Sequence, residues 1–142
     1  MNRKMLPVGI ETFSEIVGAD YYYVDKTKMI EELLTNLAKV TLFTRPRRFG
    51  KSLNMSMLRS FFEIGTDKTI FENLYIYGNR ELCDRYMGRY PVISISLKGV
   101  EAENYNTACE MFSRLILNEA MRFSILKDSD VLDAEDKRQY MD

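Results

Sequence analysis

Histidine is absent from the 142 residues of the chain, and only two cysteines, Cys83 and Cys109, are present. Without histidine the chain has no zinc site with histidine ligands, no Ser-His-Asp triad and no Cys-His nucleophile pair. The two cysteines lie 26 positions apart in the sequence, and we expect both to be reduced thiols that are buried or half-buried. Several common catalytic devices are therefore excluded.

Long apolar runs and a strong net charge are also lacking. No segment approaches the ~20 consecutive apolar residues that cross a bilayer, and the first residues lack the apolar core of a secretory signal. We therefore predict a cytoplasmic protein with no membrane partner. Lys and Arg, 20 in all, nearly balance 21 Asp and Glu, so any basic site must be local.

The spacing of apolar residues predicts helices that alternate with strands. The predicted elements are an irregular arm (1–25), a helix (26–38), a strand, turn and helix (39–65), a loop with short helical pieces (66–90), and a strand and helix (91–126). The alternation favours an α/β layered fold with a parallel sheet. A chain of this length is expected to form one domain with its own core.

Two short segments carry the strand prediction. Residues 39–44, KVTLFT, are apolar and β-branched, which is typical of a buried strand. Residues 91–97, PVISISL, alternate apolar and small polar side chains, with Pro91 at the first position, where a strand tolerates it.

The turn after the first segment, RPRRFGKS at residues 45–52, matches the end of the phosphate-binding pattern G-x-x-x-x-G-K-[ST]. Gly50 lets the backbone approach a phosphate, and Lys51 can reach the β- and γ-phosphate oxygens. The Ser52 hydroxyl can bind Mg²⁺, and the start of the next helix adds free N–H groups and a positive dipole end. Arg45, however, stands where the pattern has its first glycine.

Four sequence blocks occur in order: LPVGIETFSEI, YYYVDKTKMI, TRPRRFGKSLNMSML and GRYPVISISLKGV. With them the chain resembles the predicted AAA-ATPase-like domain family of bacterial proteins over residues 5–140. In that family the loop takes the form RPRRFGK[ST], so Arg45 is ordinary there. The resemblance implies a P-loop NTPase fold that binds ATP and Mg²⁺. It assigns nucleotide binding to Arg48, Phe49, Gly50, Lys51, Ser52 and Leu53, and the metal to Ser52. It leaves the roles of Asp25 and Lys26, in the YVDKT block, open.

An acidic element for hydrolysis is missing from the sequence. P-loop enzymes use an apolar strand that ends in Asp or Glu, but PVISISLKG ends in Lys98 and only two apolar residues precede Asp133. Proteins of the resembling family are longer, and the acidic strand and often a nuclease-like domain follow the part matched here. We therefore expect the N-terminal part of one AAA-ATPase-like domain, with slow hydrolysis by this chain alone and no assigned catalytic residue.

Two other functions stay open. Five cations, Arg45, Arg47, Arg48, Lys51 and Arg59, would also suit a nucleic-acid backbone, although no aromatic residues alternate with them as a stacking platform requires. A scaffold with a vestigial P-loop is the other alternative, with nine Met, nine Tyr and eight Phe as contact surface. Residues 21–23, three tyrosines, are expected to pack on the core or to stack on a base. Unpaired sheet edges would favour self-association, and a nuclease-like domain would add nucleic acid as a partner.

Overall fold

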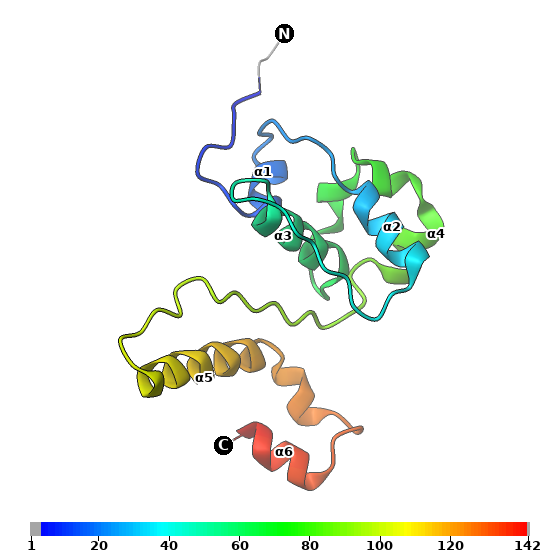
Figure 1. Ribbon diagram of the computed structural model, residues 1–142. Coiled ribbons are helices and arrows are strands. Elements are labelled where there is room, and N and C mark those ends of the chain that lie inside the picture. The colour runs from blue at the N-terminus through cyan, green and yellow to red at the C-terminus, as the bar shows by residue number, and fades with distance from the viewer. Residues whose placement is uncertain (1–3, 142) are drawn as a thin grey trace. The chain divides into compact units, whose positions relative to one another are not determined.

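The computed structural model describes residues 4–141 (Figure 1). The chain forms two compact units, Met1–Val92 and Ile93–Asp142, and each is described by itself. The first unit contains α1 (Phe13–Gly18), α2 (Lys28–Asn36), α3 (Lys51–Phe62), the 3₁₀ helices η1 (Lys68–Phe71) and η2 (Tyr75–Gly78), and α4 (Arg80–Tyr86). The second contains α5 (Tyr105–Arg122), η3 (Ser124–Asp128) and α6 (Ala134–Met141).

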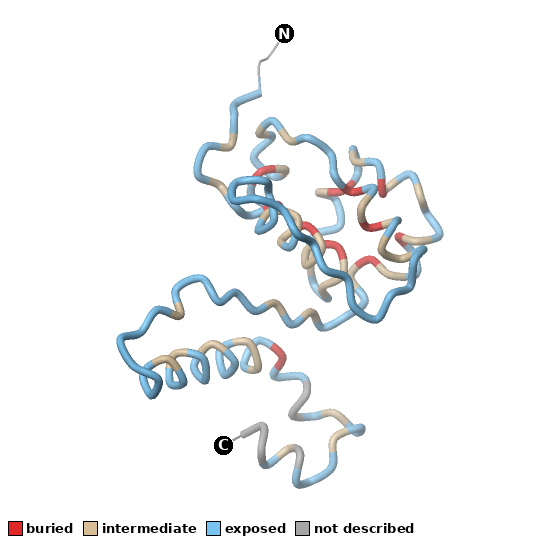
Figure 2. Tube along the Cα trace, in the orientation of Figure 1, coloured by how far each residue is buried: buried red, intermediate tan, exposed pale blue. Residues whose placement is uncertain are grey.

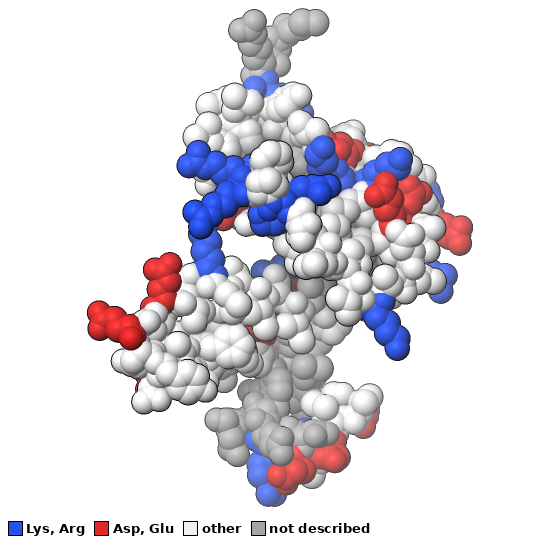
Figure 3. Space-filling model, in the orientation of Figure 1, with Lys and Arg blue, Asp and Glu red and all other residues white. Residues whose placement is uncertain are grey.

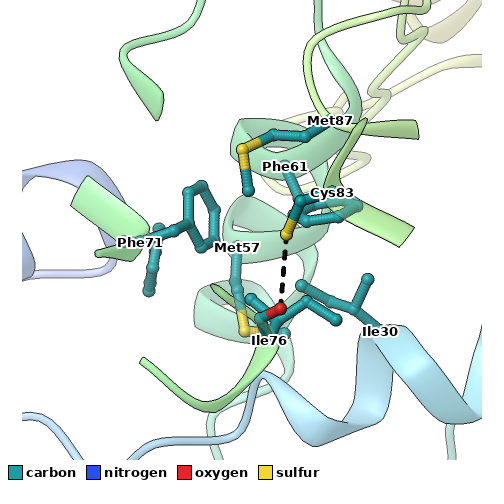
Figure 4. Close-up of a cluster of buried hydrophobic side chains, with 8 residues drawn as sticks. Ile30, Met57, Phe61, Phe71, Ile76, Cys83 and Met87 are labelled. Carbon is teal, nitrogen blue, oxygen red and sulfur yellow. Dashed lines mark hydrogen bonds between the residues drawn. The ribbon is translucent and has the colours of Figure 1, made fainter. Parts of the chain in front are cut away.

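The core of the first unit is a cluster of apolar side chains that converge on α3 (Figure 4). Its members are Phe13, Ile30, Met57, Phe61, Phe71, Ile76, Cys83 and Met87. The Phe61 ring centroid lies 5.5 Å from that of Phe71, and the Cys83 thiol donates a hydrogen bond to the Ile76 carbonyl oxygen at 3.3 Å. Cys83 and Cys109 are both free, and Cys83 is buried as the sequence predicts, whereas Cys109 is exposed. This cluster fixes α3, and with it the loop that precedes α3.

The helix α3 forms where its apolar spacing predicts a helix. Met57 and Phe61, four residues apart, are both fully buried on the inner face. The helix ends at Phe62, where Glu63 becomes extended, and the Arg59 guanidinium donates to the Glu63 carboxylate at 2.6 Å. α1 packs beside α3, and the Phe13 N–H donates to the Ser56 hydroxyl at 3.0 Å. The first unit is thus assembled around α3.

The arm holds more helix than the sequence predicts. The expected irregular arm over 1–25 contains α1, whose Phe13 and Ile16 are buried three residues apart. A helix of six residues is too short to give a clear periodic signal. The short helical pieces expected within 66–90 are present as η1, η2 and α4.

The second unit is built on α5, the helix of the strand and helix predicted over 91–126. The Asn104 side chain caps α5 by accepting from the Thr107 N–H at 2.9 Å. The extended segment before α5 is tied to it, because the Ser94 N–H donates to Glu119 Oε1 at 2.7 Å. Among the residues described in this unit Phe123 alone is buried (Figure 2). No helix in the described part of the chain is long and apolar enough to span a membrane.

The prediction of an α/β fold with a parallel sheet is wrong for the described residues. The structure is 51% helical with 2% strand and no sheet, and one isolated parallel bridge joins Glu63 to Tyr90. Neither 39–44 nor 91–97 forms a strand, and Val40 and Leu42 are 85% and 83% exposed. An apolar pattern shows that a segment suits a sheet, but a strand also needs a neighbour that pairs with its N–H and C=O groups. Self-association stays a prediction, although the sheet edge on which it was based is absent here.

Candidate functional site

The loop from Arg45 to Gly50 leads into α3 with an unusual backbone. Arg48 and Gly50 both have positive φ, 67° and 72°, and Phe49 lies between them. A non-glycine residue in this conformation is strained by about 1 to 2 kcal/mol, and such strain concentrates at functional sites. Backbone N–H groups of a turn that contains left-handed residues can form a concave anion-binding site, which is called a nest.

The Lys51 side chain spans this loop. Its Nζ donates to the carbonyl oxygens of Arg45 at 2.6 Å and Pro46 at 2.9 Å. Two of the three ammonium protons are therefore used to hold the loop, and one stays available for an anion. The structure thus places the predicted phosphate-binding lysine at the centre of the loop.

The first turn of α3 carries free backbone donors. Gly50 is the N-cap and supplies no side-chain cap, and the first hydrogen bond of the helix runs from the Asn54 N–H to the Gly50 carbonyl oxygen at 2.9 Å. The N–H groups of Lys51, Ser52 and Leu53 precede that bond, so they have no acceptor within the helix. Together with the dipole they favour a negative charge at this end.

Ser52 and Leu53 differ in what they can contribute. The Ser52 side chain is exposed in the first turn, and its hydroxyl takes part in none of the hydrogen bonds found among residues 4–141. It is therefore available as an oxygen ligand for Mg²⁺. The Leu53 side chain packs against the core cluster, so only its N–H can face a phosphate.

A cavity of about 680 Å³ opens beside Lys51. Its charged lining residues are Asp25, Lys26, Lys28, Glu32, Arg45 and Lys51. Lys and Arg side chains also gather over this face of the first unit (Figure 3). Four cations against two carboxylates give the cavity a positive balance, whereas the whole chain has a net charge of −1. The basic site is local, as the composition requires.

The YVDKT block, whose role the sequence left open, joins α2 to η2. Asp25 Oδ1 accepts from the N–H and the hydroxyl of Thr27 at 2.8 and 2.7 Å, and its Oδ2 accepts from the Tyr75 N–H at 2.6 Å. Thr27 is fully buried and its Oγ1 accepts from the Ile76 N–H at 3.1 Å. Asp25 and Thr27 therefore have a structural role.

A second carboxylate strengthens the same junction. Glu31 on α2 accepts from the Tyr75 hydroxyl at 2.7 Å and from the Asn79 amide at 2.9 Å. These two hydrogen bonds lower the pKa of Glu31, and the same carboxylate raises the pKa of the Tyr75 phenol. The wall of the cavity that carries residues 25–32 is thus held to η2 at several points.

Replacing Asp25 with Ala is expected to destabilise the first unit by about 2 kcal/mol, because three donors lose a charged acceptor. Urea unfolding measures the change. Glu32→Ala is the matched control: Glu32 lines the same cavity, and no hydrogen bond to it is found among the described residues, so its loss should cost less than about 0.5 kcal/mol. Equal costs for the two variants would contradict the structural role of Asp25.

Tyr23 resolves part of the open question about the three tyrosines. Its ring packs edge-on against Phe13 with centroids 5.3 Å apart, and its hydroxyl donates to Met57 Sδ at 3.3 Å. The hydroxyl also accepts from the Lys26 N–H at 3.3 Å. The pKa of Tyr23 is raised to about 12, mainly because the side chain is partly buried. The hydrogen bond from the Lys26 N–H lowers this pKa, and the charge of Asp25 raises it. Tyr23 is therefore a core residue, whereas Tyr22 is 54% exposed.

The raised pKa of Tyr23 predicts a loss of stability in alkali. The unfolded tyrosine ionises near pH 10 but the folded one near pH 12, so its contribution is complete below pH 10 and disappears as the pH rises to about 12. We expect the wild type to lose more stability than Tyr23→Phe between about pH 9 and pH 11, measured by urea unfolding. Tyr22→Phe should keep the wild-type dependence; an identical pH profile for Tyr23→Phe would refute the role of Tyr23.

Only some of the other residues predicted to bind nucleotide or nucleic acid lie at the cavity. Phe49 is 65% exposed at the tip of the loop and lines the cavity with Arg45 and Lys51, whereas Arg47 and Arg48 do not line it. Arg59, counted among the five cations of the nucleic-acid alternative, pairs with Glu63. Lys26 also lines the cavity, although the sequence assigns it no role beyond its place in the YVDKT block.

Comparisons with known proteins place the chain in a family. A family model described as Predicted AAA-ATPase matches residues 7–141. An uncharacterized protein in the vnfD 5' region of Azotobacter chroococcum mcd 1 is 40% identical over 100 residues, which cover 70% of this chain and 18% of that protein. The chain thus matches less than a fifth of that relative's length. No solved structure matches.

The matched region includes the loop, α3, the cavity and the Asp25–Thr27 junction. It covers nearly the whole chain, and the resemblance that the sequence blocks suggest is therefore confirmed. The chain belongs to the predicted AAA-ATPase-like family.

Proposed function

We propose that the chain binds ATP with Mg²⁺, and that residues 45–52 and the first turn of α3 hold the phosphates. The single observation that carries the proposal is the position of Lys51, which spans a loop of strained backbone directly before an uncapped helix start. Gly50, Lys51, Ser52 and Leu53 would donate N–H groups to phosphate oxygens. Membership of a family described as ATPase supports the same ligand.

The residues present also suit Mg²⁺. Bound with a triphosphate, this ion would neutralise phosphate charge, and Ser52 supplies the free hydroxyl oxygen. Arg45 and Lys26 add positive charge beside Lys51. Arg48 and Phe49 shape the loop, and Phe49 lies where a nucleotide in the cavity would meet it.

Calorimetric titration with Mg-ATP, and separately with adenosine, tests this proposal. Because the proposed contacts are all to phosphates, Mg-ATP should bind in a saturable manner while adenosine at the same concentration should not. Absence of Mg-ATP binding, or equal binding of adenosine, would refute phosphate binding.

Nucleic acid is the second candidate ligand, because Lys and Arg gather over the same face (Figure 3). The pairing of Arg59 with Glu63 removes one of the five cations from that surface. A salt-dependent shift of labelled DNA that competing Mg-ATP leaves unchanged would favour nucleic acid over nucleotide. The scaffold alternative would leave both ligands unbound.

Hydrolysis of ATP by this chain alone is expected to be slow. No strand that ends in Asp or Glu occurs in the described part, and both oxygens of the Asp25 carboxylate already accept hydrogen bonds. Phosphate release should stay well below the rates of about 1 to 1,000 s⁻¹ of ordinary enzymes. Turnover within that range, abolished in Lys51→Ala, would show that the chain carries a complete catalytic set.

A further inference from the structure

Lys26 lies at the edge of the loop, between two cavities. It lines the cavity of about 680 Å³ together with Lys51, and a second, mostly apolar cavity of about 200 Å³ together with Gly50 and Leu53. Phe49 and Asn54 also line both cavities. A residue that borders the loop lysine on one side and the start of α3 on the other is close to any phosphate bound there.

The backbone at Lys26 is fixed on both sides. Its N–H donates to the Tyr23 hydroxyl at 3.3 Å. Its neighbours Asp25 and Thr27 bind the N–H groups of Tyr75 and Ile76 at 2.6 and 3.1 Å. Only the side-chain torsions of Lys26 are left to be ordered on binding, which limits the entropy cost of positioning its ammonium group.

The charges around Lys26 leave its ammonium available. Lys51 donates to loop carbonyls, and Arg45 Nη1 donates to the Thr44 carbonyl at 3.1 Å. The Asp25 carboxylate is occupied by backbone and hydroxyl donors. Among residues 4–141 no hydrogen bond or ion pair of the Lys26 ammonium is found, so it has no protein partner to give up when an anion enters.

We propose that Lys26 is a second phosphate-binding residue, which binds the oxygens of a nucleoside triphosphate that Lys51 does not reach. This rests on the proposed function, and it adds discrimination by the number of phosphates. Lys51 and the start of α3 hold the phosphate nearest the loop, and Lys26 adds its contact only to a chain long enough to extend past them. The Asp25–Thr27 junction then has a purpose in the site, since it positions Lys26.

Affinities of the 142-residue chain for Mg-ATP, Mg-ADP and AMP, in the wild type and in Lys26→Met, test this role. Methionine keeps the unbranched apolar stem and removes the charge. We expect Lys26→Met to weaken Mg-ATP binding about tenfold, the size of one charge-assisted hydrogen bond, and to leave AMP binding unchanged. Lys28→Met, which removes the same charge from the same cavity, is the matched control and should change Mg-ATP affinity less than threefold.

The outcomes separate the two proposals. If the wild type binds Mg-ATP and Lys51→Ala does not, the proposed function stands, and unchanged Mg-ATP affinity in Lys26→Met overturns the role of Lys26 alone. Equal losses of Mg-ATP affinity in Lys26→Met and Lys28→Met would also overturn it, because they indicate the overall positive field of the cavity. Equal losses of affinity for Mg-ATP and AMP in Lys26→Met would overturn it as well, because they indicate a contact that does not depend on the number of phosphates. A wild type that does not bind Mg-ATP overturns both. Unfolding curves establish that the variants are folded.

Discussion

Replacing Lys51 with Ala is expected to lower the affinity for Mg-ATP about a hundredfold. The Lys51 ammonium is held in the loop by the carbonyl oxygens of Arg45 and Pro46, with its third proton available. Its loss removes a charge-assisted contact to phosphate and also the two bonds that keep the loop in shape. Together these effects amount to about 2.7 kcal/mol, which is a factor of a hundred in the dissociation constant. Calorimetric titration with Mg-ATP measures the change.

Lys28→Ala is the control for this substitution. Lys28 lines the same cavity but begins α2 and contacts none of the loop carbonyls in the hydrogen bonds found among the described residues. Its removal should change the affinity only slightly, because an exposed charge contributes little. If both variants lost affinity equally, the loss would reflect the overall field of the cavity, and Lys51 would have no special position.

Replacing Phe61 with Ala is expected to cost about 3 to 5 kcal/mol of the free energy of unfolding of the first unit. The ring is fully buried and touches two aromatic neighbours, with centroids 5.0 Å from Phe62 and 5.5 Å from Phe71. Truncation leaves a cavity in the middle of a small core that cannot collapse easily. Because a domain is stable by only about 5 to 15 kcal/mol, the loss should unfold a visible fraction of the molecules. Urea unfolding measures the difference.

Phe49→Ala controls for the loss of an aromatic ring as such. The Phe49 side chain is exposed on the loop and lies outside the core cluster, so its truncation should cost less than about 0.5 kcal/mol. A similar cost for Phe49→Ala and Phe61→Ala would mean that the core is not centred on α3. It would also remove the rigid support that the site is inferred to have.

The helices that pack on the core were predictable from the sequence. Ile30 on α2 and Met57 and Phe61 on α3 are buried where the three- and four-residue spacing places them. Spacing of this kind reports a local property, because a helix satisfies its own backbone groups. The short helix α1 was missed, since Phe13 and Ile16 alone are too few to show a period.

The strand predictions were wrong because a sheet is not a local structure. Val40 and Leu42 have the right side chains for a buried strand, yet they are exposed, and among residues 4–141 no neighbour pairs with them. Likewise the alternating pattern in 91–97 indicates a segment that suits a strand, but it does not show whether a partner strand is present. Single-sequence reasoning therefore identified segments that are able to form strands, and tertiary pairing decided the outcome.

The candidate site was predictable in part. Gly50, Lys51 and Ser52 are recognisable because their chemistry follows from residue type and position. The clamp that Lys51 makes on the loop was not predictable, because it depends on the carbonyls of Arg45 and Pro46 pointing inward. The proximity of Lys26 was also hidden, because Lys26 and Lys51, 25 positions apart in the sequence, meet in one cavity only after folding.

The most direct test of the central claim is a titration of the ¹⁵N-labelled chain with Mg-ATP, followed by amide chemical shifts. If the phosphates bind at the start of α3, the amide signals of Gly50, Lys51, Ser52 and Leu53 should show the largest, saturable shifts. Signals from α4, which belongs to the same unit and lines neither cavity beside the loop, should stay nearly unchanged. Saturable binding with the largest shifts outside residues 45–53, or no shift at these amides, would contradict phosphate binding at this loop.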